Sequence, residues 1–212
     1  MSLALLTPAE AQSGYPSAHA LLTLAELRTA AGFGVGGTDD EVTALGDGIA
    51  LAVARHCGVA SAGLAPPTLR KETLVETVRL DAVVTRLILR RRFISVLNVE
   101  QGGTALDLSQ IEVEAGAGMV SRLSAGGHAK WCGGPIAVTY EAGFDDVPAD
   151  IRMAAILVAR QAISAQRRDL AVKVDAVNDV DRVEYFDPTI FGADMIPPAA
   201  MRLLAAYKTE NL

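Results

Sequence analysis

The sequence predicts an α+β fold in which an α-helical core carries an inserted antiparallel β-domain and an extended C-terminal tail that ends in a short helix. Three observations predict it: two helix-capping motifs near the N-terminus, a change of hydrophobic period from 3.6 to 2 after Pro66-Pro67, and the return of a long helical pattern at Pro148. The predicted parts are an N-terminal arm (1–22), a helical core (23–66 and 145–168), an inserted β-rich domain (67–144) and a C-terminal tail (169–212).

Two capping motifs predict the N-terminal helices. The segments Thr23-Leu24-Ala25-Glu26 and Thr38-Asp39-Asp40-Glu41 both have the form of a capping box, so we expect helices over residues 24–31 and 39–56. Between them, the glycine-rich stretch 32–37 is a helix stop rather than a phosphate loop, because no strand precedes it and it lacks the Walker lysine. Residues 1–22 show no clear period and are expected to form a loose arm.

Short alternating segments after Pro67 predict an antiparallel sheet or a small barrel. The expected strands cover residues 74–80, 86–89, 93–99, 111–115, 119–123 and 135–140. Arg90, Arg91 and Arg92 lie between two of these strands. They form either a solvated turn or a contact for an acidic partner surface or a nucleic-acid phosphate.

The C-terminal third begins with a long helix and ends with a short one. Pro148 suits a first helical turn, and apolar residues at helical spacing continue to about Arg167. From Asp169 the pattern weakens until a short amphipathic helix over residues 199–207. Its apolar side chains are Met201, Leu203, Leu204 and Tyr207. Such a helix either docks on a partner or packs on its own domain.

The composition predicts a methyl-rich, closely packed core. Of 212 residues, 50% are hydrophobic and 5% aromatic, and 36 are alanines. No apolar run approaches the roughly 18 residues of a membrane helix, so no membrane association is expected. A secretory signal is not expected either, because Arg28 is the first cation. Cys57 and Cys132 could form at most one disulfide, but we expect both to be buried as small apolar side chains in a reducing compartment.

The charge is unevenly distributed. The net charge of −6 argues against a general nucleic-acid binder. Between Thr68 and Arg92, however, seven cations against three anions give a net charge of +4. A basic band on an acidic chain predicts a contact with a like molecule or with a different partner.

The sequence contains no constellation that predicts catalysis. His19, His56 and His128 stand in an arm, at a helix end and in a glycine-rich loop, with neither a G-x-S-x-G nor an H-E-x-x-H motif. His128 and Cys132 would supply two metal ligands, whereas a closed zinc site needs four. We therefore predict no enzymatic activity and no catalytic, cofactor or metal site.

The stretch from Trp131 to Arg152, WCGGPIAVTYEAGFDDVPADIR, resembles a signature of phage head-tail connector proteins, the adaptor family that includes the adaptors of gene transfer agents. Its marked residues here are Trp131, Tyr140, Gly143 and Pro148, and their role is structural. The resemblance extends to the two N-terminal helices (24–59), a central strand pair (87–99) and the C-terminal segment (169–212).

The resemblance implies a structural virion protein of the neck, made in the bacterial host cytoplasm. Proteins of that family form a ring, usually of twelve copies, beneath the portal protein. The ring extends the DNA channel, through which DNA passes without specific binding, and carries the stopper or tail protein. By this analogy Met201, Leu203, Leu204 and Tyr207 would contact the portal, and Arg90, Arg91 and Arg92 a neighbouring subunit or partner.

Two alternatives remain open. The chain could be another neck or tail-completion protein, which differs in position rather than in class. It could also be a host α+β domain that binds a small molecule, in which case a pocket with converging polar groups is expected.

Overall fold

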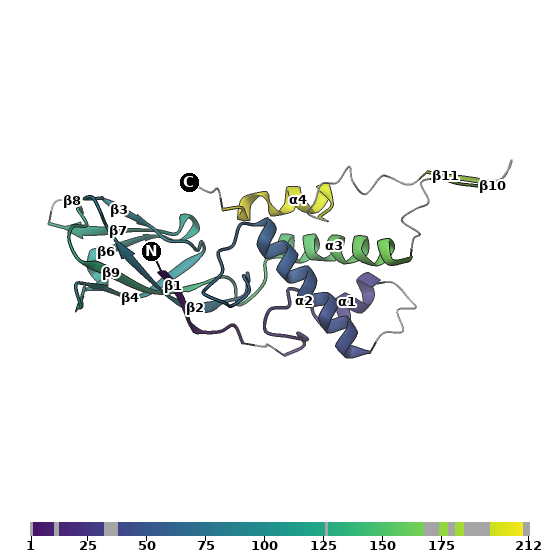
Figure 1. Ribbon diagram of the computed structural model, residues 1–212, viewed down its shortest axis with the longest axis horizontal. Helices are drawn as coiled ribbons and strands as arrows, with labels where there is room; N and C mark the ends of the chain where they lie inside the picture. Colours follow the sequence, from purple (N-terminus) through teal and green to yellow (C-terminus); the bar gives the residue numbers. More distant parts are fainter. Residues whose placement is uncertain are drawn as a thin grey trace. The chain divides into compact units, whose positions relative to one another are not determined.

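A computed structural model describes residues 2–10, 13–31, 38–125, 127–167, 174–177, 181–184 and 196–209. The chain divides into two compact units, which we call the sheet unit (Met1–Ala11, Gly58–Val147 and Thr209–Leu212) and the helical unit (Gln12–Cys57 and Pro148–Lys208). Figure 1 labels their elements. The predicted α+β class is confirmed, and a short C-terminal helix is present.

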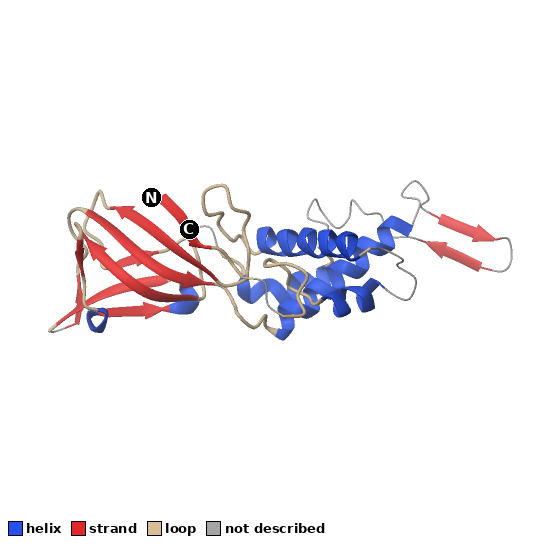
Figure 2. Ribbon diagram, turned by 90° about the horizontal axis from the view of Figure 1, so that it is seen from below, coloured by secondary structure: helices blue, strands red, loops and turns tan. Residues whose placement is uncertain are grey.

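The sheet unit contains a five-stranded antiparallel sheet of order β1-β2-β9-β4-β5 and a second antiparallel sheet of order β3-β7-β6, with β8 also paired to β7 (Figure 2). The strands are β1 (Ser2–Thr7), β2 (Glu72–Arg79), β3 (Arg86–Ile88), β4 (Ile94–Gln101), β5 (Thr104–Ala105), β6 (Ile111–Glu114), β7 (Met119–Ser124), β8 (Gly127–Ala129) and β9 (Pro135–Ala142). Two 3₁₀ turns, η1 (Leu108–Gln110) and η2 (Ala115–Ala117), flank β6. The strands expected after Pro67 are confirmed, while β5 and β8 were not expected.

The core of the sheet unit is built from alternate residues of the strands. In β2, Glu72, Leu74, Glu76 and Val78 are buried and the residues between them are half-buried. Opposite them β9 contributes Ile136, Val138 and Tyr140, each fully buried. Alternation of this kind follows from the period of 2 in a strand. Two of the inward positions are therefore carboxylates rather than apolar side chains.

The expectation of a loose N-terminal arm is wrong for residues 2–7. They form β1, which pairs antiparallel with β2 at the edge of the five-stranded sheet. Leu3 reaches the core, where it is 7% exposed. A single edge strand with one buried leucine leaves almost no periodic signal in the sequence, because pairing with β2 rather than its own pattern holds it in place.

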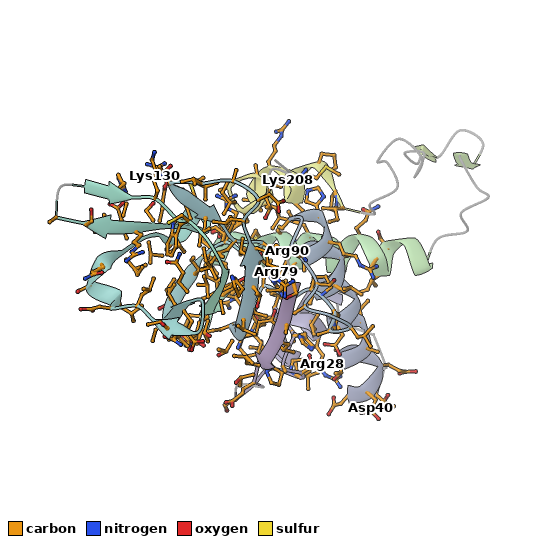
Figure 3. All side chains as sticks on the ribbon, turned by 60° about the vertical axis from the view of Figure 1, so that its left-hand side comes forward. Arg28, Asp40, Arg79, Arg90, Lys130 and Lys208 are labelled. Carbon is orange, nitrogen blue, oxygen red and sulfur yellow. The ribbon has the colours of Figure 1, made fainter. Side chains whose placement is uncertain are left out.

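The helical unit contains α1 (Leu24–Ala31), α2 (Asp39–His56), α3 (Ala149–Arg167) and α4 (Pro198–Leu204), followed by a 3₁₀ turn, η4 (Ala205–Tyr207). The predicted capping box opens α2: Thr38 accepts from Glu41 N, and the Glu41 side chain accepts from Thr38 N. Arg28 of α1 forms an ion pair with Asp39 at the start of α2; Figure 3 labels Arg28 and Asp40, the residue that follows Asp39.

Small residues let the helices approach closely. A Cβ on Gly46 of α2 would lie 2.8 Å from Leu27 Cδ1 of α1, so the absence of a side chain at Gly46 makes room for Leu27. Ala154, Ala155 and Ala159 of α3 are fully buried. The close packing predicted from the alanine content is present at these positions.

The tail is more structured than expected. Val174–Val177 (β10) and Asp181–Glu184 (β11) pair as an antiparallel hairpin, which forms a two-stranded sheet of its own. The remainder of the predicted tail between residues 168 and 195 lies outside the described residues.

Candidate functional site

The triple-arginine segment lies between β3 and β4, where the sequence places it, but Arg91 points into the sheet unit. Its side chain is 4% exposed and forms an ion pair with Glu72 of β2. Its Nη1 also donates to Thr68 O over 2.9 Å. Both sequence interpretations, a solvated turn and a surface contact, are therefore wrong for Arg91, because the inward carboxylate of β2 supplies its partner inside the same unit.

Arg90 and Arg92 also bind their own unit. Arg90 donates its backbone N–H to Glu76 Oε2 over 3.0 Å, and its Nε lies 3.8 Å from Glu76 Oε1. Arg92 Nε donates to Gly116 O in η2 over 2.7 Å, and its guanidinium lies 5.4 Å from the centre of the Phe93 ring. We call these three arginines with Glu72 and Glu76 the arginine clasp. It joins β2 of one sheet to the η2 turn beside the other.

Burial sets the electrostatics of the clasp. It raises the pKa of the Glu72 carboxyl above its usual value, an effect that the charge of Arg91 opposes. Burial and the neighbouring Glu76 raise the pKa of Tyr140 well above its ordinary range, so the hydroxyl stays protonated and donates to Glu76 Oε2 over 3.0 Å. A buried carboxylate needs such donors, since an unpaired charge in a core is strongly destabilising. The clasp is thus a structural feature of the sheet unit.

The C-terminal helix packs on its own unit. Among the four predicted portal contacts, Leu204 is fully buried, whereas Met201, Leu203 and Tyr207 are half-buried. In Figure 1, α4 lies alongside α3, and the two helices make extensive contacts. Leu204 is therefore occupied inside the helical unit, and the prediction that it forms an accessible contact is wrong for this conformation.

A hydrogen bond holds the end of the C-terminal segment. Tyr207 Oη lies 2.8 Å from both carboxylate oxygens of Asp150, at the start of α3, and donates to that group. Burial and then this bond raise the pKa of Tyr207 to about 12. Tyr207 therefore links η4 to the N-terminal end of α3.

The signature residues occupy structural positions. Trp131 is fully buried in the core of the sheet unit, where its backbone pairs with Val84. Gly143 has φ +96°, and a Cβ there would lie 2.5 Å from Arg70 O. In the helical unit, Pro148 O accepts from Arg152 N in the first turn of α3. These roles are packing, a tight backbone approach and a helix start.

The described residues contain no cluster of three or more His, Cys, Asp or Glu side chains able to hold a metal ion. His128 contacts Glu112, with 3.5 Å between Nδ1 and Oε2. Cys57 is a buried free thiol, as expected, but the expectation of burial is wrong for Cys132, which is an exposed free thiol. An open depression of about 580 Å³ in the sheet unit is lined by Ser109, Gln110, Arg122, Leu123, Ser124, Ala125 and Ala129. Its single charged group, Arg122, donates to Gln101, so no converging acid, base and nucleophile are found there.

No described helix is long and apolar enough to cross a membrane.

Sequence reasoning missed the two buried carboxylates and the β1 edge. A signal for Glu76 existed, because it shares the register of Leu74 and Val78 in an alternating strand. For β1 no comparable signal was present.

Comparison with known proteins identifies a fold rather than a family. No family model matches the chain, and no curated protein sequence matches it. Among solved structures, the chain is similar to one from the neck of an empty gene transfer agent (GTA) particle, computed with C6 symmetry. The TM-score is 0.58 with 17% identity, over 100% of this chain and 97% of the other.

Proposed function

We propose that this chain is a structural subunit of the neck of a phage-like particle. The observation that supports the proposal is a fold similarity that covers the whole chain, both units included, and 97% of a chain from a particle neck. Separate domains shared by chance would match one unit and leave the other uncovered. Fold alone does not determine function, so the connector signature from Trp131 to Arg152 is the second, independent support.

Within that class we propose the role of head-tail adaptor. The chain would form a ring under the portal protein, extend the DNA channel and carry the stopper or tail protein. A ring of twelve copies is compatible with the sixfold symmetry used for the similar neck. The net charge of −6 suits a conduit that repels phosphate rather than one that grips DNA. The particle neck would be its location, after synthesis in the bacterial cytoplasm.

The structure sharpens which residues we propose as contacts. Because Leu204 is buried against the helical unit, Met201 and Leu203 are the better candidates for the portal, with Tyr207 holding the segment in place. In the triple-arginine segment, we no longer propose Arg91 as a contact for a neighbouring subunit or partner, because its side chain is buried against Glu72. Arg90 and Arg92 retain exposed side-chain surface and remain candidates for a subunit or partner contact.

Imaging of the chain mixed with its portal protein tests the proposal. We expect a ring on the narrow end of the portal. The double variant Met201→Ser with Leu203→Ser should lose portal binding while its circular dichroism stays that of the parent. Ala206→Ser, an exposed position of the same segment, is the matched control and should bind normally. No ring with the parent chain would contradict the adaptor role, and unchanged binding by the double variant would contradict the contact residues.

A further inference from the structure

β1 forms an open strand edge of the sheet unit. β1 pairs with β2 on one side and ends the sheet, so no described strand lies on its other side. Ser2–Leu5 pair with β2 in regular register, and the register shifts only between Leu5 and Thr7. These four residues include no charge and no proline, the features with which proteins usually protect an exposed edge.

The other described edges of this unit are less suited to pairing. The outer edge of β4 is open from Ile94 to Asn98, because β5 pairs only with Glu100 and Gln101, but a register shift between Val96 and Asn98 interrupts it. β5 has two residues, and β3 and β8 have three each. β6 has four residues, but Glu112 and Glu114 are exposed there. Because short, charged or irregular edges disfavour added strands, the regular run Ser2–Leu5 makes β1 the described edge best suited to a further strand.

The hairpin of β10 and β11 lacks the support of a larger sheet. Each strand has four residues, and among the described strands each pairs only with the other, which Figure 2 shows as a separate pair of arrows. A two-stranded hairpin is at best marginally stable in water without a larger sheet or a packed face. A strand added at its edge would supply that support.

Charge and length make the two elements complementary. Residues 174–184 carry four acidic side chains and one arginine, a net charge of −3. Arg79, labelled in Figure 3, stands two residues beyond Thr77, the partner of Ser2, and is exposed without an ion pair among the described residues. Each strand of the hairpin has four residues and a net charge of −1, and Asp179 between them adds a further negative charge. An acidic hairpin with four-residue strands therefore matches a neutral edge of four residues with Arg79 beyond its end.

We propose that the β1 edge binds the β10–β11 hairpin of a second copy of this chain and so extends the five-stranded sheet across the two copies. Main-chain hydrogen bonds would give affinity, as in other cases of β-augmentation, and Arg79 would favour the acidic hairpin. The contact joins two different surfaces, so it is head-to-tail, and such contacts close into rings when the rotation permits. The proposal concerns self-association and does not depend on the neck role.

Cross-linking of the full chain tests it. In a Cys132→Ser background, which removes the exposed thiol, one preparation carries Ala4→Cys and another Ala176→Cys. The two are mixed at high concentration and oxidised mildly. We expect roughly tenfold more disulfide heterodimer than from the control mixture of Glu112→Cys with Ala176→Cys, because pairing raises the local thiol concentration. Equal yields from the two mixtures would overturn the proposal.

Two further arms separate the alternatives. A chain carrying both Ala4→Cys and Ala176→Cys should form dimers and higher oligomers whose yield rises with concentration. A disulfide within one chain, formed equally at all dilutions, would overturn the assignment to a second copy. Arg79→Glu should lower the heterodimer yield severalfold, and an unchanged yield would contradict the charge complementarity. None of these readouts involves a portal, so failure here is distinguishable from failure of the adaptor role.

Discussion

The Tyr140 hydroxyl donates a hydrogen bond to Glu76 Oε2 over 3.0 Å, and both side chains are fully buried in the sheet unit. The same oxygen accepts the backbone N–H of Arg90. A carboxylate in a core is thus held by one strand neighbour and by the loop between β3 and β4. Glu76 therefore connects the stretch from Trp131 to Arg152 with the triple-arginine segment, two features that the sequence presents as unrelated.

Removing the hydroxyl tests this bond. Tyr140→Phe should lower the free energy of unfolding of the sheet unit by roughly 1–3 kcal/mol, because Glu76 loses a donor while it remains buried. Urea unfolding followed by the fluorescence of the buried Trp131 measures the change. In a Glu76→Gln background the same substitution should cost less, since the acceptor is then uncharged. Equal costs in the two backgrounds would show that the bond to the charged carboxylate is not what matters.

Loss of Arg91 should be more severe than loss of an exposed arginine. Arg91→Ala leaves Glu72 buried without its ion-pair partner, which should cost roughly 3–5 kcal/mol. Arg79→Ala is the matched control and should change stability by about 0.5 kcal/mol or less. The double variant Arg91→Met with Glu72→Leu should recover most of the loss, because it removes both charges together. A mild effect of Arg91→Ala would contradict the buried position of the ion pair.

Substitution of two glycines, Gly133 and Gly143, distinguishes the cost of backbone strain from the cost of a steric clash. Gly143 has φ +96° and Gly133 has φ +65°, so alanine is strained at either position. At Gly133 a Cβ would meet nothing within 4 Å, whereas at Gly143 it would lie 2.5 Å from the carbonyl oxygen of Arg70. We expect Gly133→Ala to cost roughly 1 kcal/mol and Gly143→Ala roughly 2–4 kcal/mol in thermal or urea unfolding. Similar costs would mean that the strand end shifts away from Arg70 freely.

The helical unit should lose stability in acid through Glu26. Burial acts to raise the pKa of Glu26, but hydrogen bonds from Arg152 and Thr23 outweigh it and hold the pKa below the ordinary value of 4.5. The ionised carboxylate of Glu26 is the form that accepts these hydrogen bonds. Its contribution to the free energy of unfolding is therefore complete above pH 4.5 and is lost as the pH falls through the lowered pKa. Unfolding measured from pH 6 to pH 3 should show a smaller pH dependence for Glu26→Gln than for the parent chain. An identical pH dependence would contradict the role of this group.

The helices and most strands could be predicted because their signals are local. The capping box at Thr38 and Glu41 forms as expected, and α1 and α2 cover the expected residues. Each depends on side chains a few residues apart, which a single sequence displays directly. Strand β9 was equally visible, because Ile136, Val138 and Tyr140 alternate in one short run.

The buried position of Arg91 in the triple-arginine segment could not be predicted, for a different reason. Arg90, Arg91 and Arg92 are adjacent in the sequence, so both interpretations, a solvated turn and a partner contact, treated them as one group. In the structure Arg91 is buried against Glu72, while Arg92 reaches Gly116 beside the other sheet. Adjacent residues in an extended loop point in different directions, and the partners of these three arginines lie 14 to 24 positions away in the sequence.

The sequence by itself determined the α+β class, the order of the main elements and the closeness of helix packing, because these follow from periodicity, capping and side-chain size. Only the tertiary structure decided that Glu72 and Glu76 are internal, that Leu204 packs against its own unit and that residues 2–7 complete a sheet. The physical reason is that burial and strand pairing depend on partners distant along the chain. The sequence pattern around a charged residue, an apolar residue or an edge strand does not show which distant residue will pair with it.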